Sequence, residues 1–501
     1  MKKLLNVRIF LLILIGAFTK AHSQTKHGNQ WVIGHLQNVL DFNTSVTELD
    51  TSLNYGILFM AQGKSNICDS NGQLLILCNG MRLFNAAGNL IELGDTLVPQ
   101  AYYADYGSVS VVSQSSIILP VDSDQYYVFT PVPTDSNFNT NWVNGYAYFD
   151  ELWYHRVDMR ANGGAGRVIE KRVPLLKQVK LSQSQMMACR HANGKDWWLV
   201  KMALDSNKAY VFYVSHDTIM LQHTIGFPPY LKIFRELHGQ SSFDAKGEHF
   251  ATVSNKFGGE FFYGDFDRCT GILSGIKRAV APHKPFNSAI DSSITGLSLS
   301  PNGQLIYVVK YSHILQFRIS DSSWYTVSGP DTTDIAFHGY KDCAVAPDGK
   351  LYIGTYGSLY KSMSVIDTPN GLLSNCNFCR RCLRSEASLG FLGAPPCIPD
   401  FKLGALSPCW PNAVEEVKLQ AQYKIYPNPV ADNLQIEWNL NGDSSGVVQL
   451  VDLTGNILLD IAFNPGYQIK SIDLSALNSG VYLLRFSSNR QTIGYEKIIK
   501  R

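Results

Sequence analysis

The chain has 501 residues, which allows roughly three domains of ordinary size or fewer, larger all-β ones. Charged residues make up only 17% of the chain, aromatic residues 12%, and glycine occurs 40 times, which argues against a disordered or coiled-coil protein and favours a turn-rich β fold. The formal net charge is only +2, so we expect neither a nucleic acid nor an anionic membrane surface as partner.

The first 23 residues have the pattern of a secretory signal peptide. Basic residues precede an apolar run over residues 9–18, and small residues stand at the −3 and −1 positions of a cut between Ser23 and Gln24. A membrane anchor is the alternative, but such an anchor needs about 20 apolar residues, and this run is shorter. We therefore expect cleavage after Ser23, export to the periplasm, and no transmembrane anchor in the mature chain.

A glycine-centred turn followed by a short β-rich run then recurs at intervals of about fifty residues. In Pro-Asp-Gly and Asn-Gly turns, proline presets φ, Asn or Asp bonds its own backbone, and glycine accepts a positive φ. Each copy therefore predicts a tight hairpin. The turn glycines are Gly72, Gly194, Gly247, Gly303 and Gly349, and a related Asp122-Ser123-Asp124 turn lies between the first two.

This period is typical of a β-propeller, in which each blade is a four-stranded sheet that with its turns uses about 40 to 55 residues. Residues 24–410 would hold seven or eight blades, and we expect about seven. A β-helix would repeat at a shorter period, and a sandwich would not repeat one turn so often. The predicted fold class is all-β: a β-propeller over 24–410, followed by a small Ig-like β-sandwich.

Several short motifs follow one another along the predicted propeller. They are Cys68-Asp69-Ser70-Asn71-Gly72, Ser116-Ile117-Ile118-Leu119-Pro120, Val157-Asp158-Met159, Phe266-Asp267-Arg268-Cys269-Thr270-Gly271 and Pro347-Asp348-Gly349-Lys350. In this order they resemble a WD40-like propeller region of proteins exported by bacteria with a type IX secretion system. One departure is Phe243-Asp244-Ala245-Lys246-Gly247, where the family favours Ser-Pro-Asp-Gly, so the turn of that blade is expected to differ.

Five of the ten cysteines lie within one short stretch near the end of the predicted propeller. A C-x-x-C-x-x-C run there is compatible with an iron–sulfur or zinc site, but the next cysteine follows too late and no second C-x-x-C pair exists. Because exported proteins meet an oxidising compartment, we favour disulfides of unknown connectivity. The disulfide candidates are Cys376, Cys379, Cys382, Cys397 and Cys409, while Cys68 and Cys78 either pair across a hairpin or remain free thiols.

The usual motifs of hydrolases, zincins, nucleotide sites and calcium loops do not occur. Asp265 and Asp267 alternate onto one strand face and could form a carboxylate pair for glycoside chemistry, but Asp-x-Asp before Thr-Gly more often marks a solvated turn. The adjacent Trp197 and Trp198 are expected mainly in the core, because neighbouring strand residues point to opposite faces. We assign no catalytic or metal-binding residue, expect no cofactor, and consider an enzyme uncertain and less favoured.

Residues 411–421 are polar and poor in aromatic residues, which predicts a linker. From 422 to 501, apolar residues alternate with polar ones, as in Leu434, Ile436 and Trp438, and Gly-containing turns separate the runs. About 80 residues with six or seven short strands predict a small β-sandwich.

Four motifs stand in this last segment. They are Tyr426-Pro427-Asn428-Pro429, Asp452-Leu453-Thr454-Gly455, Ser479-Gly480-Val481-Tyr482-Leu483-Leu484-Arg485 and Lys497-Ile498-Ile499-Lys500-Arg501. In this order the segment resembles the type A C-terminal sorting domain of the type IX secretion system. The resemblance implies recognition by the type IX secretion machinery, export across the outer membrane, and removal of the domain on release or on attachment to surface lipopolysaccharide. The alternative is an ordinary sandwich that binds carbohydrate or caps the propeller.

The sequence therefore predicts a secreted or outer-surface β-propeller protein that acts as a non-catalytic binding or adhesion module for an unknown protein or glycan. The alternative is a secreted hydrolase or lyase acting on polysaccharide or peptide, with acidic residues converging on the propeller channel. A structural role at the cell surface, including gliding, is a third possibility. For recognition by the export machinery, we expect the basic C-terminus and an edge strand to be exposed for β-augmentation.

Overall fold

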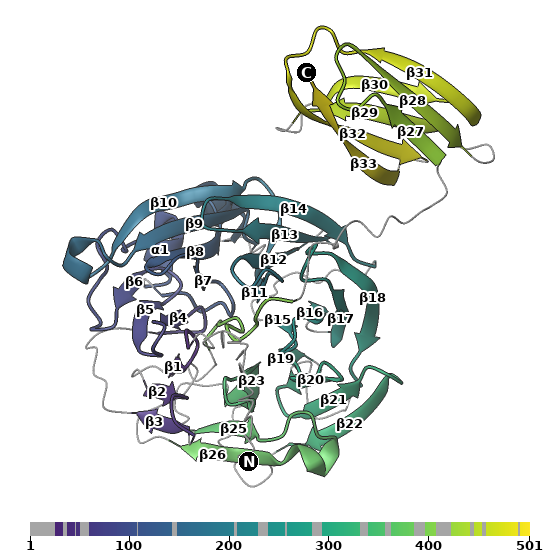
Figure 1. Cartoon of the computed structure of the whole chain (residues 1–501). Coiled ribbons are helices and arrows are strands. Elements are labelled where there is room, and N and C mark those ends of the chain that lie inside the picture. Colours follow the sequence, from purple (N-terminus) through teal and green to yellow (C-terminus); the bar gives the residue numbers. More distant parts are fainter. Residues whose placement is uncertain are drawn as a thin grey trace, which may run out of the picture. The chain divides into compact units, whose positions relative to one another are not determined.

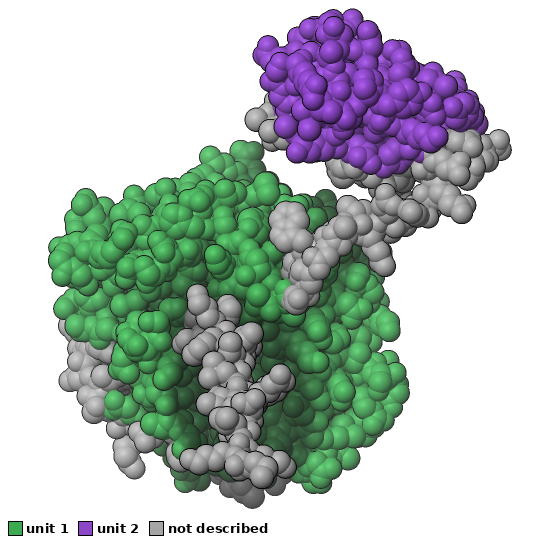
Figure 2. Space-filling view, viewed as in Figure 1, with its two compact units in different colours: residues 1–409 green, residues 410–501 purple. Residues whose placement is uncertain are grey.

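The chain forms two compact units, residues 1–409 and residues 410–501 (Figure 2). The predicted signal peptide with Ser23 and Gln24, the predicted linker, and Cys409 lie outside the described residues. The computed structural model describes residues 26–33, 38–45, 47–50, 60–107, 109–142, 148–204, 208–228, 239–255, 258–282, 293–330, 339–355, 362–384, 396–406, 422–440, 445–452, 457–488 and 491–501.

The first unit is a ring of seven antiparallel sheets in its described part (Figure 1). Each sheet is a blade whose strands follow one another in chain order, and each strand pairs antiparallel with the next. The expectation of a propeller with about seven blades is confirmed.

The first two blades have three strands each in the described residues: β1 (Gln30–Ile33), β2 (Asn38–Asp41), β3 (Glu48–Asp50); and β4 (Ser65–Cys68), β5 (Leu74–Cys78), β6 (Leu83–Asn85). Blades three to five have four strands: β7 (Ile117–Pro120), β8 (Gln125–Val132), β9 (Glu151–Asp158), β10 (Arg167–Leu176); β11 (Leu181–Arg190), β12 (Trp197–Ala203), β13 (Lys208–Val214), β14 (Ile219–Gly226); and β15 (Ser241–Phe243), β16 (His249–Asn255), β17 (Glu260–Phe266), β18 (Leu273–Val280).

The last two blades also have four strands: β19 (Ile294–Leu299), β20 (Leu305–Lys310), β21 (Ile314–Arg318), β22 (Ser323–Ser328); and β23 (Tyr340–Val345), β24 (Leu351–Thr355), β25 (Ser362–Ile366), β26 (Phe378–Arg384). Short helices occupy the connections: α1 (Gln100–Asp105), α2 (Asp135–Asn137), η1 (Phe138–Trp142), η2 (Asn162–Gly164) and η3 (Leu373–Cys376).

The repeated glycine turn joins the first and second strands of five blades. In each copy the glycine N–H donates to the carbonyl three residues earlier, and each glycine has a φ between 67° and 88°. Gly247 has this same turn although its sequence departs from Ser-Pro-Asp-Gly, so the expected difference is absent. A Cβ at Gly247 would lie 2.5 Å from the Cys189 Sγ, so close packing also requires glycine there.

Neighbouring blades bury their faces against one another, which places the core between blades rather than in one central mass. Trp197 packs towards the third blade and Trp198 towards the fifth, so the prediction of core positions on opposite faces is confirmed. The ring closes where the last blade meets the first: Trp31 and Tyr352 make an edge contact with ring centroids 5.9 Å apart. Within the described residues, this closure is made by side-chain packing and not by a strand shared between blades.

The second unit is a β-sandwich. One sheet contains β27 (Gln422–Tyr426), β28 (Asn433–Leu440) and β31 (Gly466–Asp473). The other, in spatial order, contains β30 (Ile457–Phe463), β29 (Gly446–Val451), β32 (Gly480–Ser488) and β33 (Gln491–Lys500). Trp438 from the first sheet and Phe486 from the second are fully buried between them, which confirms the predicted sandwich.

Candidate functional site

Hydrogen bonds between distant blades cross the propeller channel. Gln114 lies just before β7, and its side chain forms two hydrogen bonds to the backbone of Ser241 in the fifth blade. The Ser241 N–H donates to the Gln114 Oε1 at 2.9 Å, and the Gln114 Nε2 donates to the Ser241 carbonyl at 2.8 Å. The hydroxyl of the neighbouring Ser113 donates to the Asp342 carboxylate in the seventh blade at 2.7 Å. The third blade is therefore tied across the channel to the fifth and the seventh.

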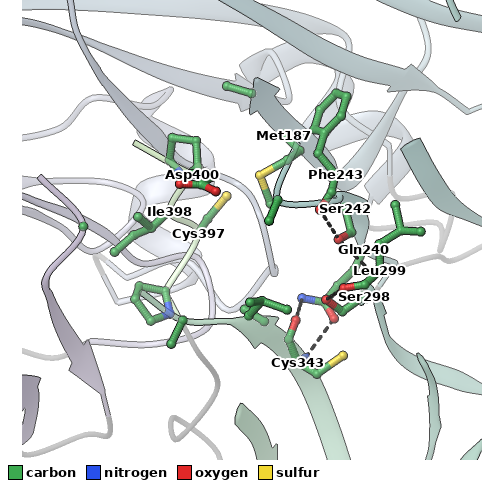
Figure 3. A pocket seen from close by; sticks show the side chains of 18 of the residues that line it. Met187, Gln240, Ser242, Phe243, Ser298, Leu299, Cys343, Cys397, Ile398 and Asp400 are labelled. Carbon is green, nitrogen blue, oxygen red and sulfur yellow. Dashed lines mark hydrogen bonds between the residues drawn. The ribbon is translucent and has the colours of Figure 1, made fainter. Parts of the chain in front are cut away.

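Gln240 makes a second set of inter-blade bonds just before β15. Its Oε1 accepts from the backbone N–H of Leu297 at 3.1 Å and of Cys343 at 3.0 Å, and its Nε2 donates to the Cys343 carbonyl at 3.3 Å (Figure 3). One buried amide thus joins blades five, six and seven. Because all these groups are buried, the bonds hold the channel-lining strands in one arrangement.

A segment after the last blade crosses one end of the channel. We name residues 396–406 the strap. Its Cys397 N–H donates to the Lys64 carbonyl beside the second blade at 3.0 Å, and its Leu406 N–H donates to the Ala192 carbonyl of the fourth at 2.9 Å. Arg268 of the fifth blade donates to the Gly404 carbonyl at 2.6 Å, and Lys402 donates to the Pro347 carbonyl of the seventh.

An aromatic contact anchors the centre of the strap. Phe401 is buried and meets Trp197 edge-on, with ring centroids 5.4 Å apart, and it meets His27 at 5.7 Å. Leu403 packs against the apolar cluster between blades four and five. The strap is therefore fixed by both backbone hydrogen bonds and buried apolar surface.

A cavity of about 280 Å³ lies between the strap and the inner strands. Its walls combine apolar side chains with amides and hydroxyls, and Figure 3 shows Met187, Phe243, Gln240, Ile398 and Asp400 around it. Burial raises the pKa of Asp400, whose Oδ1 accepts from the Lys402 N–H at 2.8 Å. The volume is near the lower end for small-molecule sites.

Lys64 and Lys201 are among the buried lysines of the propeller. Burial lowers the pKa of Lys64 to about 7, against an opposing attraction from Asp342, and it lowers the pKa of Lys201 well below its usual range. Such a lysine can act as a base or nucleophile when substrate reaches it. Here the Lys64 Nζ donates to the Ala61 carbonyl at 3.4 Å. The Lys201 Nζ donates to the carbonyls of Ser182 and Ser184. Neither lysine lines the cavity.

The two aspartates considered as a carboxylate pair have separate roles. Asp267 accepts from the Cys269 N–H at 2.8 Å and the Thr270 hydroxyl at 2.7 Å, so it forms the predicted turn. Asp265 instead lies 3.7 Å from Nε2 of His249, whose Nδ1 is 3.0 Å from Asp244. The other oxygen of Asp244 accepts from the backbone of its own hairpin, so this group organises the turn between β15 and β16.

The cysteines occupy different environments. Cys376, Cys379, Cys382 and Cys397, predicted as disulfide candidates, are free thiols in this structure. Cys68 and Cys78 are buried free thiols, which agrees with the second of their two alternatives. Cys269 is disulfide-bonded, a role that sequence analysis missed because this residue stands alone in its motif.

In the sandwich, the first and last motifs meet. Asn428 accepts from the Ile499 N–H at 3.0 Å and donates to the Lys497 carbonyl at 2.6 Å. Val430 continues this contact, because its N–H donates to the Ile499 carbonyl and its carbonyl accepts from the Arg501 N–H, both at 2.8 Å. The expectation of an open edge at the C-terminus is therefore wrong for these last residues, since residues 428–430 already cover them.

Other motif residues lie elsewhere in the sandwich. The motif from Gly480 to Leu484, comprising Gly480, Val481, Tyr482, Leu483 and Leu484, begins β32 and pairs with the end of β33, with Leu483 opposite Lys497. Asp452 follows β29, while Leu453, Thr454 and Gly455 lie outside the described residues. Lys500 is buried with its Nζ 3.6 Å from Asp432, so Lys497 and Arg501 alone present the terminal basic charge.

A Gln-Ser pair recurs near the innermost strand of three blades, but it does not by itself mark a channel-crossing residue, because Gln114 and Gln240 form inter-blade bonds whereas the buried side chain of Gln183 has no hydrogen-bond partner among the described residues. Gln-Ser pairs stand just before or near the start of the innermost strand in three blades, as Gln114-Ser115, Gln183-Ser184 and Gln240-Ser241.

In the part of the chain that the structure describes, no group of three or more His, Cys, Asp or Glu side chains is placed to hold a metal ion. No helix among these residues is long and apolar enough to cross a membrane.

Comparison with solved structures finds many distant matches. The chain has 12% identity to a putative 6-phosphogluconolactonase from Bacteroides uniformis, covering 73% of this chain and 90% of that one with a TM-score of 0.35. It has 12% identity to the periplasmic gluconolactonase PpgL of Pseudomonas aeruginosa, with the same coverages and a TM-score of 0.34. It has 10% identity to Saccharomyces cerevisiae Sqt1, covering 83% and 94% with a TM-score of 0.34. Matches at this level carry no information on activity.

No curated protein matches this chain at a significant level. Residues 424–501 match the family model of the secretion system C-terminal sorting domain. The matched range coincides with the sandwich, including the Asn428 contact and the final strand. Residues 424–501 are therefore a secretion system C-terminal sorting domain, which indicates that this β-propeller protein is exported by type IX secretion.

Proposed function

We propose that the protein acts outside the cell, or on its outer surface, as a non-catalytic binding or adhesion module. In this proposal a signal peptide cut between Ser23 and Gln24 delivers the chain to the periplasm, and the sorting domain then carries it across the outer membrane. The propeller is the part that meets an extracellular protein or glycan.

The observation that carries this proposal is the state of the channel. A hydrolase or lyase site needs acidic groups that converge on substrate in an accessible cleft. Here the Asp342 carboxylate accepts a hydrogen bond from Ser113, the Asp244 carboxylate organises its own hairpin, and residues of the strap form one wall of the cavity beside Asp400. This arrangement favours binding through the outer surface over chemistry in the channel.

Two adjacent blades offer such a surface. Strands β14 and β18 are the outermost strands of blades four and five, and each leaves one edge without a strand partner in the described residues. Met220 on β14 is 47% exposed, and Val280 on β18 is 50% exposed. Exposed apolar side chains on neighbouring edges are typical of protein contact sites.

The test uses the purified full-length protein on a glycan array and in capture of surface proteins from cultured cells of the producing species. We expect one retained ligand class, and we expect Met220→Asp to weaken capture by at least about tenfold, because a charge placed in an apolar contact costs more than 1.4 kcal/mol. Leu90→Asp, an exposed position on the second blade, is the matched control. Cleavage of a polysaccharide or peptide panel that disappears in Asp342→Asn would instead establish an enzyme.

A further inference from the structure

Two cysteines lie at the ends of a bulge in the outermost strand of blade seven. Cys379 of β26 stands opposite Val365 of β25, and Leu383 stands opposite Met363, so residues 380–382 face the single residue between those partners. Arg381 within the bulge has a φ of 51°, in the left-handed region. Such a bulge shortens the path between its ends and brings the two cysteines together.

The two side chains are in contact. The Cys382 Sγ donates to the Cys379 carbonyl at 3.4 Å, and the two thiols also hydrogen-bond to each other. Cys382 is exposed and Cys379 is half-buried, so a reagent in solvent reaches the pair. The thiols are therefore both close together and accessible.

Neighbouring residues hold the bulge in this shape. Arg380 donates to the Ser328 hydroxyl at 2.7 Å and to the Gly329 carbonyl at 3.2 Å, which fixes the bulge to blade six. The Arg381 N–H donates to the Ser364 hydroxyl at 3.0 Å. Because these bonds fix the backbone between the cysteines, bond formation needs little rearrangement of the fold.

We propose that Cys379 and Cys382 are a disulfide site that closes when the protein meets an oxidising compartment. In the cell, closure of this disulfide relies on the proposed export. The oxidant is a protein or glutathione disulfide. One cysteine, as thiolate, attacks this disulfide and expels one thiolate. The second cysteine then attacks the mixed disulfide and expels the other thiolate. The cysteine pair thereby loses two hydrogen atoms, that is, two protons and two electrons. The oxidising disulfide takes them up and becomes two thiols.

The other two free thiols described in the cysteine-rich stretch are placed differently. Cys376 is buried and hydrogen-bonds to the Tyr307 hydroxyl, and Cys397 is buried in the strap with its Sγ 3.6 Å from the Met186 carbonyl. Among the described residues, neither thiol hydrogen-bonds to another cysteine side chain. The geometry thus selects one pair from the cysteine-rich stretch, whose connectivity the sequence leaves open.

The expected role of the bond is local. The loop that it closes is very short, and short loops give little chain-entropy stabilisation. The bond would instead lock a bulge at the edge of the last blade, where an exposed strand edge and an exposed free thiol both favour unwanted association. Locked bulges of this kind discourage edge-to-edge strand pairing.

The test is peptide mapping of the folded full-length protein equilibrated with reduced or oxidised glutathione and then blocked with N-ethylmaleimide. Trypsin cuts after Arg380 and Arg381, so Cys379 and Cys382 leave on separate peptides unless a disulfide joins them. In oxidised glutathione we expect the peptide Ser362–Arg380 linked to Cys382–Arg384, and a fall of at least about tenfold in the blocked Cys382 peptide.

Two variants identify the partner. Because Cys376 shares the longer peptide with Cys379, the linked species should persist in Cys376→Ser and vanish in Cys379→Ser. Blocked free thiols at both positions in oxidised glutathione, separate glutathione adducts, or a linkage lost in Cys376→Ser would each overturn the proposal. The equilibration is done on purified protein, so this result is independent of whether the cell exports the chain.

Discussion

The side chain of Asn428 holds the backbone of Ile499, 71 residues further along the chain, with a 3.0 Å hydrogen bond from the Ile499 N–H to Oδ1. Its Nδ2 also donates to the Lys497 carbonyl. A residue of the first motif of the sorting domain therefore holds the end of its final strand. This contact joins the first and last motifs of the domain in space.

Replacing Asn428 with alanine should loosen the end of β33. The change removes both side-chain hydrogen bonds, which we expect to cost about 1–3 kcal/mol of local stability. Hydrogen exchange of the full-length protein should show faster exchange of the Ile499 amide and little change in the propeller. Asn478→Ala is the control, because its side chain is exposed. Equal exchange at Ile499 in both variants would contradict the contact.

Two turn glycines should respond differently to alanine. A Cβ at Gly271, where φ is 75°, would lie 2.7 Å from the Trp198 ring, whereas a Cβ at Gly349, where φ is 80°, would meet nothing within 4 Å. Gly349→Ala should lower the free energy of unfolding by about 1 kcal/mol, because alanine strains the backbone at this positive φ. Gly271→Ala should cost about 1–3 kcal/mol more, because Trp198 must move. Denaturant unfolding of the propeller compares the two, and equal losses would be inconsistent with the close packing.

His155 should make the propeller sensitive to acid. Its Nδ1 accepts from the Arg172 N–H and its Nε2 contacts the Thr130 hydroxyl, both at 3.1 Å, so the ring is neutral. Burial, aided by Arg172, lowers its pKa to about 3 from the usual 6.5. Below pH 6.5 the unfolded chain binds a proton that the folded chain does not, so stability falls as pH drops towards 3.

The free energy of unfolding is expected to fall by about 2–3 kcal/mol between pH 7 and 4.5. Urea unfolding at several pH values measures it. His155→Gln, which keeps a polar side chain but cannot titrate, should be less stable at pH 7 and should lack this part of the pH dependence. An unchanged slope in the variant would assign the acid sensitivity to other groups.

Phe401 should govern whether the strap stays in place. Phe401→Ala removes a buried ring from its contacts with Trp197 and His27, a change that typically costs about 3–5 kcal/mol. We expect faster exchange of the Cys397 and Leu406 amides, which bond to the ring of blades, and entry of small probes into the cavity. Leu406→Ala, at an exposed position, should leave the exchange of the Cys397 amide and the entry of probes unchanged.

The turns of this protein could be predicted from sequence because local chemistry determines them. The conformation of Gly303 follows from its own four-residue segment and does not depend on the rest of the fold. The sorting domain was similarly accessible, because its motifs are contiguous. In both cases the information lies within a few neighbouring residues.

The channel could not be predicted in the same way. Gln114 and Ser241 are 127 residues apart, and their pairing exists only once blades three and five have been placed by ring closure. The strap was likewise interpreted only as part of a cysteine-rich stretch, because nothing local indicates that Phe401 reaches Trp197. Long-range contacts of this kind depend on the whole topology and leave little trace in a single sequence.

The central claim is that the C-terminal sandwich carries the propeller across the outer membrane. The most direct measurement is cell fractionation of the producing bacterium expressing either the full chain or a chain lacking Gly480–Arg501, with Gly349→Ala as a control for mild destabilisation. We predict that the full chain and the control reach the outer surface or medium, and that the truncated chain accumulates in the periplasm. Delivery of the truncated chain to the surface at the level of the full chain would contradict the account.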